Sequence, residues 1–226
     1  MKKFIVPAAV LALSACSFGF TYSINDGTPE DSIGLNTSSA SIYWSTSFTA
    51  TAGNTNISSV SVMFGFNTGT FATNGTAVRI SLVRDANNDG IADTGGLVSD
   101  LSSTVTGANT NAFQVYNIPD FNFAAGDGFV VSVILQNGPT NTFPATIDQT
   151  APVSNRNYIA FDTAATIDAN NVSAVAAAQR GFVESFGLPG NWMINAEATS
   201  VPEPASMAVL GFGALAVLRR RRNKKA

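Results

Sequence analysis

One short stretch of the sequence, residues 85–93, concentrates oxygen-bearing side chains and reads DANNDGIAD. Its Asp and Asn residues at relative positions 1, 3, 5 and 9, with glycine at position 6, match the calcium-loop pattern D-x-[DN]-x-[DN]-G. Ca²⁺ takes about 6–8 oxygen ligands, and alternate residues of a tightly curled loop can point inward together. The pattern therefore predicts a structural Ca²⁺ site formed by Asp85, Asn87, Asp89, Asp93 and the backbone carbonyl of Ile91.

This loop departs from an EF-hand in two respects. Position 12 is Gly96, where an EF-hand has a bidentate glutamate, and we expect strands rather than helices on both sides. A calcium loop inside a β-hairpin fits both departures. The alternative is an Asx-rich turn without an ion, because Asn, Asp and Gly are also the residues of ordinary turns. The sequence leaves both interpretations open.

The inventory of side chains excludes several kinds of catalysis. The chain has no histidine, and its single cysteine, Cys16, lies near the N-terminus, so residues 20–200 hold no His or Cys zinc site, thiol nucleophile, Ser-His-Asp triad or disulfide. A glycosidase needs only two carboxylates, so a carbohydrate-active hydrolase remains as the alternative. The acids considered for it are Glu184, Asp120, Asp127, Asp148 and Asp162. No spacing pairs any two of them, and we therefore expect a protein that is not an enzyme.

Aromatic residues offer a second kind of binding site. Tyr43-Trp44 and Trp192 could form a platform on which sugar rings stack. Each also lies in a strand-like segment beside apolar neighbours, so burial in the core is the alternative.

The charges are distributed unevenly. Lys2 and Lys3 begin the chain and six of the 12 Lys and Arg follow Leu218, which leaves four arginines against fourteen acidic residues, a net charge of −10, in residues 20–200. Such a body has no basic patch for phosphates, which argues against nucleic-acid binding.

The pattern of apolar residues predicts strands. Residues 59–66 and 76–84 alternate with a period of two, and the apolar run at 128–136 predicts a central strand buried on both faces. Further candidates are 41–50, 96–106, 112–118, 158–161, 180–186 and 191–198. Short strands separated by turn residues predict one all-β domain over residues 20–200, an antiparallel, jelly-roll-like β-sandwich. Residues 168–179 are expected to form a short helix or a loop.

The N-terminus has the features of an export signal. Met1-Lys2-Lys3 precedes twelve largely apolar residues, 4–15, which predicts a secretory signal peptide over residues 1–19. Small residues at Ser17 and Gly19 favour signal peptidase, with the mature chain starting near Phe20. Residues 13–16, Leu-Ser-Ala-Cys, also resemble a bacterial lipobox, in which Cys16 would carry a lipid. The two cleavage predictions are alternatives.

The last 26 residues, 201–226, form three consecutive pieces. The first is Val201, Pro202, Glu203 and Pro204, where the prolines keep the backbone extended. The second, residues 205–218, predicts a membrane helix of about 21 Å, short for a hydrocarbon core of about 30 Å. The third is the cluster Arg219, Arg220, Arg221 and Arg222, which the positive-inside rule places in the cytoplasm.

This tripartite tail resembles the PEP-CTERM sorting signal. The resemblance implies export, recognition by an exosortase, processing near the Pro-Glu-Pro, and a surface or extracellular-matrix destination in a Gram-negative-type bacterium. It also implies a link with exopolysaccharide and biofilm production. A permanent membrane anchor without processing is the alternative. We expect a non-enzymatic structural or adhesive protein, with carbohydrate binding or hydrolysis as the alternative function.

Overall fold

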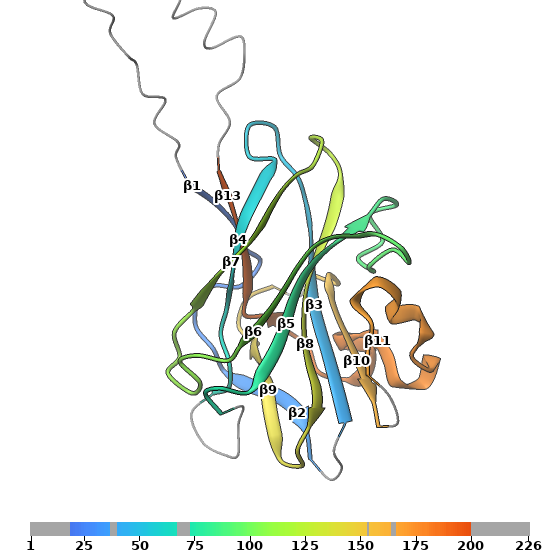
Figure 1. The fold of residues 1–226 in the computed structure, drawn as a ribbon. Coiled ribbons are helices and arrows are strands. Elements are labelled where there is room, and N and C mark those ends of the chain that lie inside the picture. Colours follow the sequence, from blue (N-terminus) through green and yellow to red (C-terminus); the bar gives the residue numbers. More distant parts are fainter. Residues whose placement is uncertain (1–18, 37–39, 67–72, 153, 164–165, 200–226) are drawn as a thin grey trace, which may run out of the picture. The chain divides into compact units, whose positions relative to one another are not determined.

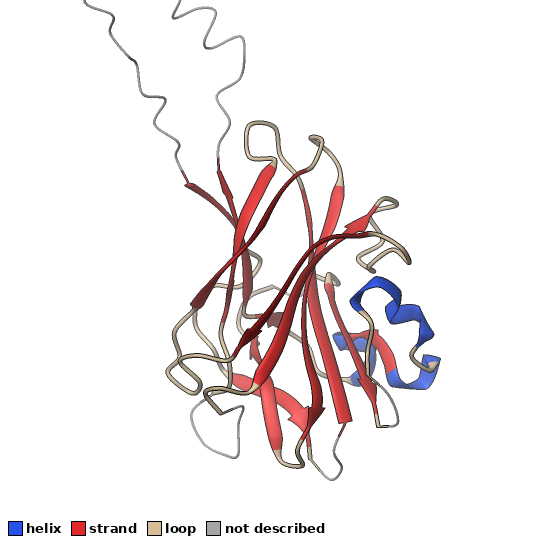
Figure 2. Cartoon of the chain, viewed as in Figure 1, coloured by secondary structure: helices blue, strands red, loops and turns tan. Residues whose placement is uncertain are grey.

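The computed structural model describes residues 19–36, 40–66, 73–152, 154–163 and 166–199. These residues form thirteen strands and three short 3₁₀ helices, and Figure 2 shows the helical turns gathered at one side of the strands. The predicted signal peptide before residue 19, with Cys16, lies outside the described residues, as do the sorting motif, the membrane segment and the arginine cluster.

The largest sheet has six strands in the order β11-β10-β3-β8-β5-β6 (Figure 1). Its members are β3 (Ala40–Thr49), β5 (Ala77–Asp85), β6 (Leu97–Thr104), β8 (Gly128–Gly138), β10 (Asn157–Asp162) and β11 (Arg180–Phe182). All neighbours pair antiparallel.

Two smaller sheets make up the opposing layer. One has the order β1-β13-β4-β7, with β1 (Gly19–Tyr22), β4 (Asn56–Val62), β7 (Gln114–Asn122) and β13 (Ile194–Thr199). The other has the order β12-β9-β2, with β2 (Asp31–Leu35), β9 (Thr142–Asp148) and β12 (Asn191–Trp192). The bridge between Phe64 and Ala145 joins the two sheets, and the amide of Met63 donates to the carbonyl of Met193 at 3.0 Å beside it.

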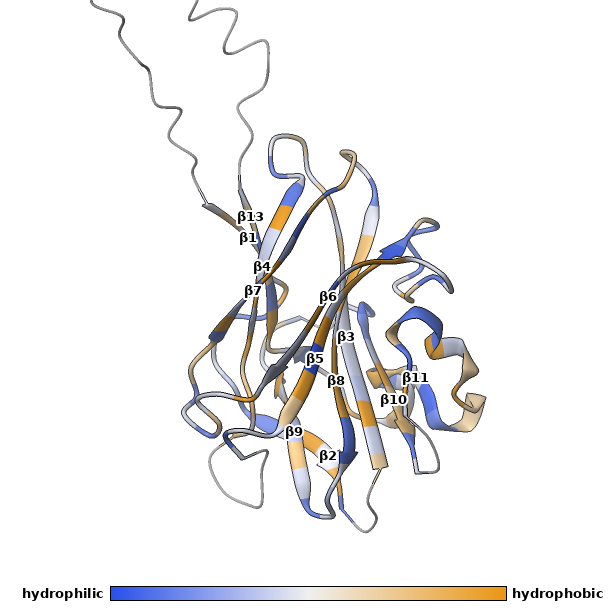
Figure 3. Cartoon of the chain, in the orientation of Figure 1, coloured by the Kyte–Doolittle hydropathy of each residue, from blue (hydrophilic) through white to orange (hydrophobic). Residues whose placement is uncertain are grey.

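The main core lies between the layers. Residues such as Trp44, Leu82 and Val131 from the six-stranded sheet pack there with Val60, Ile147 and their neighbours from the smaller sheets. Figure 3 shows the matching pattern, with apolar segments on the strands and polar ones at many of the turns. The predicted antiparallel β-sandwich is confirmed.

A second core covers the outer face of the six-stranded sheet. The segment from Ile167 to Val175 packs there against Tyr43, Val130 and Ile134. Strand β8 is consequently buried on both faces, as its continuous apolar run predicts.

Residues 168–179 contain two 3₁₀ helices, η1 (Ala169–Ala174) and η2 (Ala177–Gln179). Asp168 caps η1 by accepting a hydrogen bond from the backbone N–H of Asn170 at 3.0 Å. A third, η3 (Val183–Phe186), takes up most of the segment predicted as one strand at 180–186, because only its first three residues pair with β10.

Candidate functional site

The Asp-rich loop connects β5 to β6, which pair antiparallel, so strands flank it as expected. Asp85 ends β5 and is fully buried. Its two carboxylate oxygens accept hydrogen bonds from the N–H groups of Asp89 at 3.0 Å and Gly90 at 2.9 Å. Gly90 has φ +87°, a left-handed conformation that favours glycine, so its place in the motif has a backbone reason whether or not an ion binds.

The other carboxylates of the loop are also engaged by the loop itself. Asp89 accepts from the N–H of Ile91 at 2.9 Å and from the side-chain amide of Asn87 at 2.8 Å. Asp93 accepts from the N–H of Ala86 at 2.8 Å. The contact from Ile91 to Asp89 is an Asx turn, and the contact from Ala86 to Asp93 joins the two ends of the loop through a carboxylate.

The donor chemistry of the loop suits Ca²⁺, but the described residues contain no group of three or more His, Cys, Asp or Glu side chains arranged to hold a metal ion. A carboxylate oxygen that accepts one hydrogen bond keeps a second lone pair, so the loop could still share its oxygens with an ion. Calcium at Asp85, Asn87, Asp89, Ile91 and Asp93 stays a prediction. Burial raises the pKa of Asp85 above its ordinary value, and the charges of Asp89 and Asp93 act in the same direction.

The five acids considered for hydrolysis lie on different parts of the fold. Asp120 is in β7, Asp127 precedes β8, Asp148 ends β9, Asp162 ends β10 and Glu184 is in η3. Asp120 accepts from the side-chain amide of Asn56 at 3.3 Å, and Asp127 accepts from the N–H of Ala124 at 2.9 Å. The carboxylate oxygens of Glu184 are buried, without a hydrogen-bond partner among the described residues.

Asp148 is a buried anchor between distant segments. One oxygen accepts from the N–H of Asp26 at 2.7 Å, and the other accepts from the N–H groups of Thr150 and Ala151, each at 2.9 Å. Burial acts to raise the pKa of Asp148, but these amides outweigh it and hold the pKa below the ordinary value. Asp148 is thus stabilised as an anion by the backbone amides that it ties together.

Of the two interpretations of Tyr43, Trp44 and Trp192, burial in the core is confirmed and the sugar-stacking platform is wrong. Tyr43, Trp44 and Trp192 are each 0% exposed. Tyr43 and Trp44 lie on β3, in the middle of the six-stranded sheet between the two cores, and the indole of Trp192 donates to the carbonyl of Tyr158 at 3.2 Å. Burial raises the pKa of Tyr43 to about 12, so its hydroxyl stays protonated.

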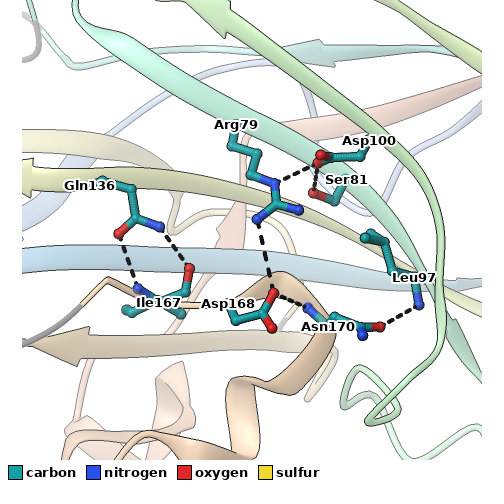
Figure 4. Close-up of polar contacts among 8 residues, drawn as sticks. All are labelled: Arg79, Ser81, Leu97, Asp100, Gln136, Ile167, Asp168 and Asn170. Atoms are coloured by element: carbon teal, nitrogen blue, oxygen red, sulfur yellow. Dashed lines mark hydrogen bonds and ion pairs between the residues drawn. The ribbon is translucent and has the colours of Figure 1, made fainter.

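A polar network fixes the segment over the outer face of the six-stranded sheet (Figure 4). The side chain of Gln136 forms a reciprocal pair with the backbone of Ile167, donating at 2.7 Å and accepting at 3.0 Å. Arg79 pairs with Asp100 at 2.7 Å and approaches Asp168 at 3.9 Å. Sequence patterns gave no signal for this network, since its members come from strands and a connection far apart in the chain.

A pocket of about 250 Å³ opens beside β1. It lies where β1 approaches the C-terminal end of β3 and the residue just before β10. Its lining is Phe20, Thr21, Tyr22, Ser23, Ile24, Ser47, Phe48, Thr49, Thr51 and Arg156. None of these is acidic, and none was singled out from the sequence.

The comparisons with known structures concern the fold. The sandwich resembles the lectin-like domain of Cwp84, a surface-layer-associated cysteine protease of Clostridium difficile. The structure of its protease and lectin-like domains has TM-score 0.53 and 12% identity, covering 81% of this chain and 36% of that one. A second Cwp84 structure, of a variant of the protease after propeptide cleavage, has TM-score 0.55 and 13% identity, covering 81% and 40%. At this identity the likeness establishes the fold, and it spans well under half of each Cwp84 chain.

The C-terminal segment then identifies how the domain is handled. Residues 200–222 match the PEP-CTERM protein-sorting motif, so the predicted resemblance to this sorting signal is confirmed. The predicted motif residues Val201, Pro202, Glu203 and Pro204 lie within the matched range. The motif implies exosortase processing and export to the cell surface. No curated protein sequence matches the chain. Within the described residues, no helix is both long enough and apolar enough to cross a membrane.

Proposed function

We propose that this protein is a non-enzymatic structural or adhesive component of the cell surface or extracellular matrix that contacts exopolysaccharide. The PEP-CTERM motif at residues 200–222 carries the proposal. It follows directly after β13, which supports the β-sandwich as cargo of the motif.

The positions of the acidic residues support a role without catalysis. A glycosidase needs two carboxylates about 5–10 Å apart across a cleft. Asp148 is tied up by backbone amides, the other acids lie on separate elements, and the lining of the pocket beside β1 contains no acid. The chain also has no histidine that could activate a serine or tyrosine hydroxyl.

Contact with polysaccharide is supported by the class of fold. The likeness to a lectin-like domain concerns shape alone, and a rigid sandwich is a common scaffold on which loops and edges bind ligands. Burial of both tryptophans means that any contact must use other residues.

The sorting part is tested by replacing Pro202, Glu203 and Pro204 with alanine in the full chain, expressed in a bacterium that has an exosortase. Antibody against the sandwich should find the wild type in the surface and matrix fractions and the variant in the membrane fraction. Ser206→Ala with Met207→Ala, inside the apolar run, is the matched control and should be sorted normally. Equal release of the Pro-Glu-Pro variant would contradict the proposal.

The polysaccharide part is tested by sedimenting the protein with exopolysaccharide isolated from the same bacterium. We expect the protein in the pellet and no shortening of the polysaccharide. Cleavage of the chains would contradict the non-enzymatic role, and a protein that stays in the supernatant would contradict the contact.

A further inference from the structure

The pocket beside β1 contains an unusual charge. Three of the four arginines in residues 20–200 have side-chain partners within the described chain: Arg79 with Asp100 at 2.7 Å, Arg84 over the ring of Phe121 at 5.1 Å, and Arg180 with the hydroxyl of Tyr158 at 3.3 Å. Arg156 is a half-buried residue, and its guanidinium has no hydrogen-bond or ion-pair partner among the described residues, although its backbone carbonyl accepts from the N–H of Ser47 at 2.9 Å. An arginine that pairs with none of fourteen acids, and lines a pocket, is available to an external anion.

Three hydroxyl groups of the lining have already used their hydrogens, while the hydroxyl of Ser47 is buried without a hydrogen-bond partner among the described residues. Thr21 donates to Glu197 at 2.6 Å, Ser23 donates to the carbonyl of Asn25 at 3.1 Å, and Thr49 donates to Asn88 at 3.1 Å. Each hydroxyl oxygen keeps acceptor capacity. Toward a ligand, the lining therefore offers the donors of one guanidinium and several hydroxyl acceptors.

The remaining wall is aromatic. Phe20 is 37% exposed and packs edge-on against Tyr22, with ring centroids 4.8 Å apart, while Tyr22 lies 5.9 Å from Phe48. The hydroxyl of Tyr22 is already occupied, because it donates to the carbonyl of Asn54 at 2.8 Å and accepts from the N–H of Thr51 at 2.9 Å. Tyr22 and Phe48 are themselves buried, so Phe20 supplies the exposed apolar surface, which suits the C–H face of a sugar.

We propose that this pocket binds one uronic acid unit of an acidic polysaccharide, with its carboxylate on Arg156 and its hydroxyl groups donating to the threonine and serine oxygens. This inference rests on the proposed function and names the ligand class. A ligand that is acceptor-only at one end and rich in O–H donors elsewhere matches both halves of the lining. The volume of about 250 Å³ lies below the range of about 300–1,000 Å³ for drug-sized ligands, so a single sugar unit fits better than an oligosaccharide.

The net charge of the body favours a carboxylate over a phosphate. With a net charge of −10 on residues 20–200 and one arginine in the pocket, a dianion would leave one charge uncompensated, whereas a carboxylate is neutralised. Repulsion from acids more than about 8 Å away is screened at physiological ionic strength. The local balance is therefore set by Arg156 and by Glu197, which accepts from the lining residue Thr21 at 2.6 Å.

The test is a calorimetric titration of the full-length chain in a neutral detergent with methyl β-D-glucuronide, with methyl β-D-glucoside as the neutral comparison. The glucuronide should bind at least about tenfold more tightly than the glucoside, since a charge-assisted bidentate contact distinguishes them. Arg156→Gln should reduce glucuronide binding to the level of the glucoside. Arg84→Gln removes the same charge at an exposed site outside the pocket and should leave binding unchanged.

Thermal melts of Arg156→Gln and Arg84→Gln establish that both variants are folded, and Arg156→Lys, which keeps the charge, should retain part of the affinity. Equal binding of glucuronide by wild type and Arg156→Gln, equal binding of glucoside and glucuronide, no glucuronide binding, or displacement by lower concentrations of inorganic phosphate would each overturn the proposal. Sedimentation with matrix polysaccharide separates it from the proposed function. If Arg156→Gln still sediments, the pocket is wrong and the contact stands, and if the wild type does not sediment, the contact itself is wrong.

Discussion

Asp148→Asn changes one oxygen to an amide nitrogen and leaves the size of the side chain unchanged. Of the two oxygens of Asp148, one accepts from the N–H of Asp26, and the other accepts from Thr150 and Ala151. An asparagine can place its oxygen toward Thr150 and Ala151, but its NH₂ group then faces the N–H of Asp26. Two donors face each other, and the tie between the segment around residue 26 and β9 is lost.

The cost follows from these contacts. Losing one charge-assisted hydrogen bond in a buried site costs about 1.5–3 kcal/mol, and the two amides that remain bonded now meet a neutral acceptor instead of an anion. We therefore expect Asp148→Asn to lower the free energy of unfolding by about 2–4 kcal/mol at pH 7. Asp120→Asn is the matched control, because Asp120 is exposed and accepts only from Asn56 at 3.3 Å, and it should cost under about 0.5 kcal/mol.

The stabilisation by Asp148 should depend on pH in a direction set by its lowered pKa. The folded pKa of Asp148 lies below its value in the unfolded chain, about 3.9, so the folded state binds fewer protons and the stabilisation is present above that pH. It is lost as the pH falls through the folded pKa. Urea unfolding of wild type and Asp148→Asn should show the full difference at pH 7 and a shrinking one below about pH 4. A difference as small as that of Asp120→Asn, or one that stays constant into strong acid, would refute the reasoning.

Two further predictions concern the loop and the core. If the loop at Asp85 binds Ca²⁺ with a Kd of about 10⁻⁴–10⁻³ M, about 10 mM Ca²⁺ should stabilise the fold by about 1.4–2.7 kcal/mol and raise the Tm by about 3–11 °C. Asp85→Asn should abolish this rise in Tm. If neither calcium nor a chelator changes the Tm of the wild type, the prediction of a calcium site in this loop is wrong. Trp192→Phe should cost about 1.5–3 kcal/mol, because it removes the hydrogen bond to Tyr158 at 3.2 Å and leaves space in the core. It should leave polysaccharide sedimentation unchanged, and loss of sedimentation by a folded Trp192→Phe variant would contradict the burial of this residue.

The strands found from the sequence are those with strong local patterns. The continuous apolar run predicts β8, and alternation predicts β5 and most of β4. β1, β2 and β9 were not predicted, because each alternates over only two or three apolar residues. β9 also contains Pro144, and β2 contains Gly34, where a Cβ would meet the backbone of β9. In these strands the pairing with neighbours, rather than the local sequence, decides the conformation.

The tryptophans show why the sequence alone cannot tell whether a side chain on a strand is buried or exposed. Apolar and polar residues alternate around Trp44 in β3, a pattern typical of a strand with one exposed face. The second core under the 3₁₀ segment covers the outer face, so even Tyr43, on the side opposite to Trp44, is buried. That cover depends on Gln136 holding Ile167, a contact between residues 31 positions apart. No local pattern encodes it.

Local and non-local signals also differ between the sorting motif and the proposed binding pocket. The sorting motif is contiguous, so residues 200–222 alone are enough to recognise it. The pocket beside β1 needs Phe20, Thr49 and Arg156 in one place, and β1 reaches the end of β3 only because it pairs with β13, at the other end of the chain. A binding site of this kind exists only after the last strand is in place. Since residue 200 follows that strand directly, the pocket is complete only when the chain up to the sorting motif has been made and has folded.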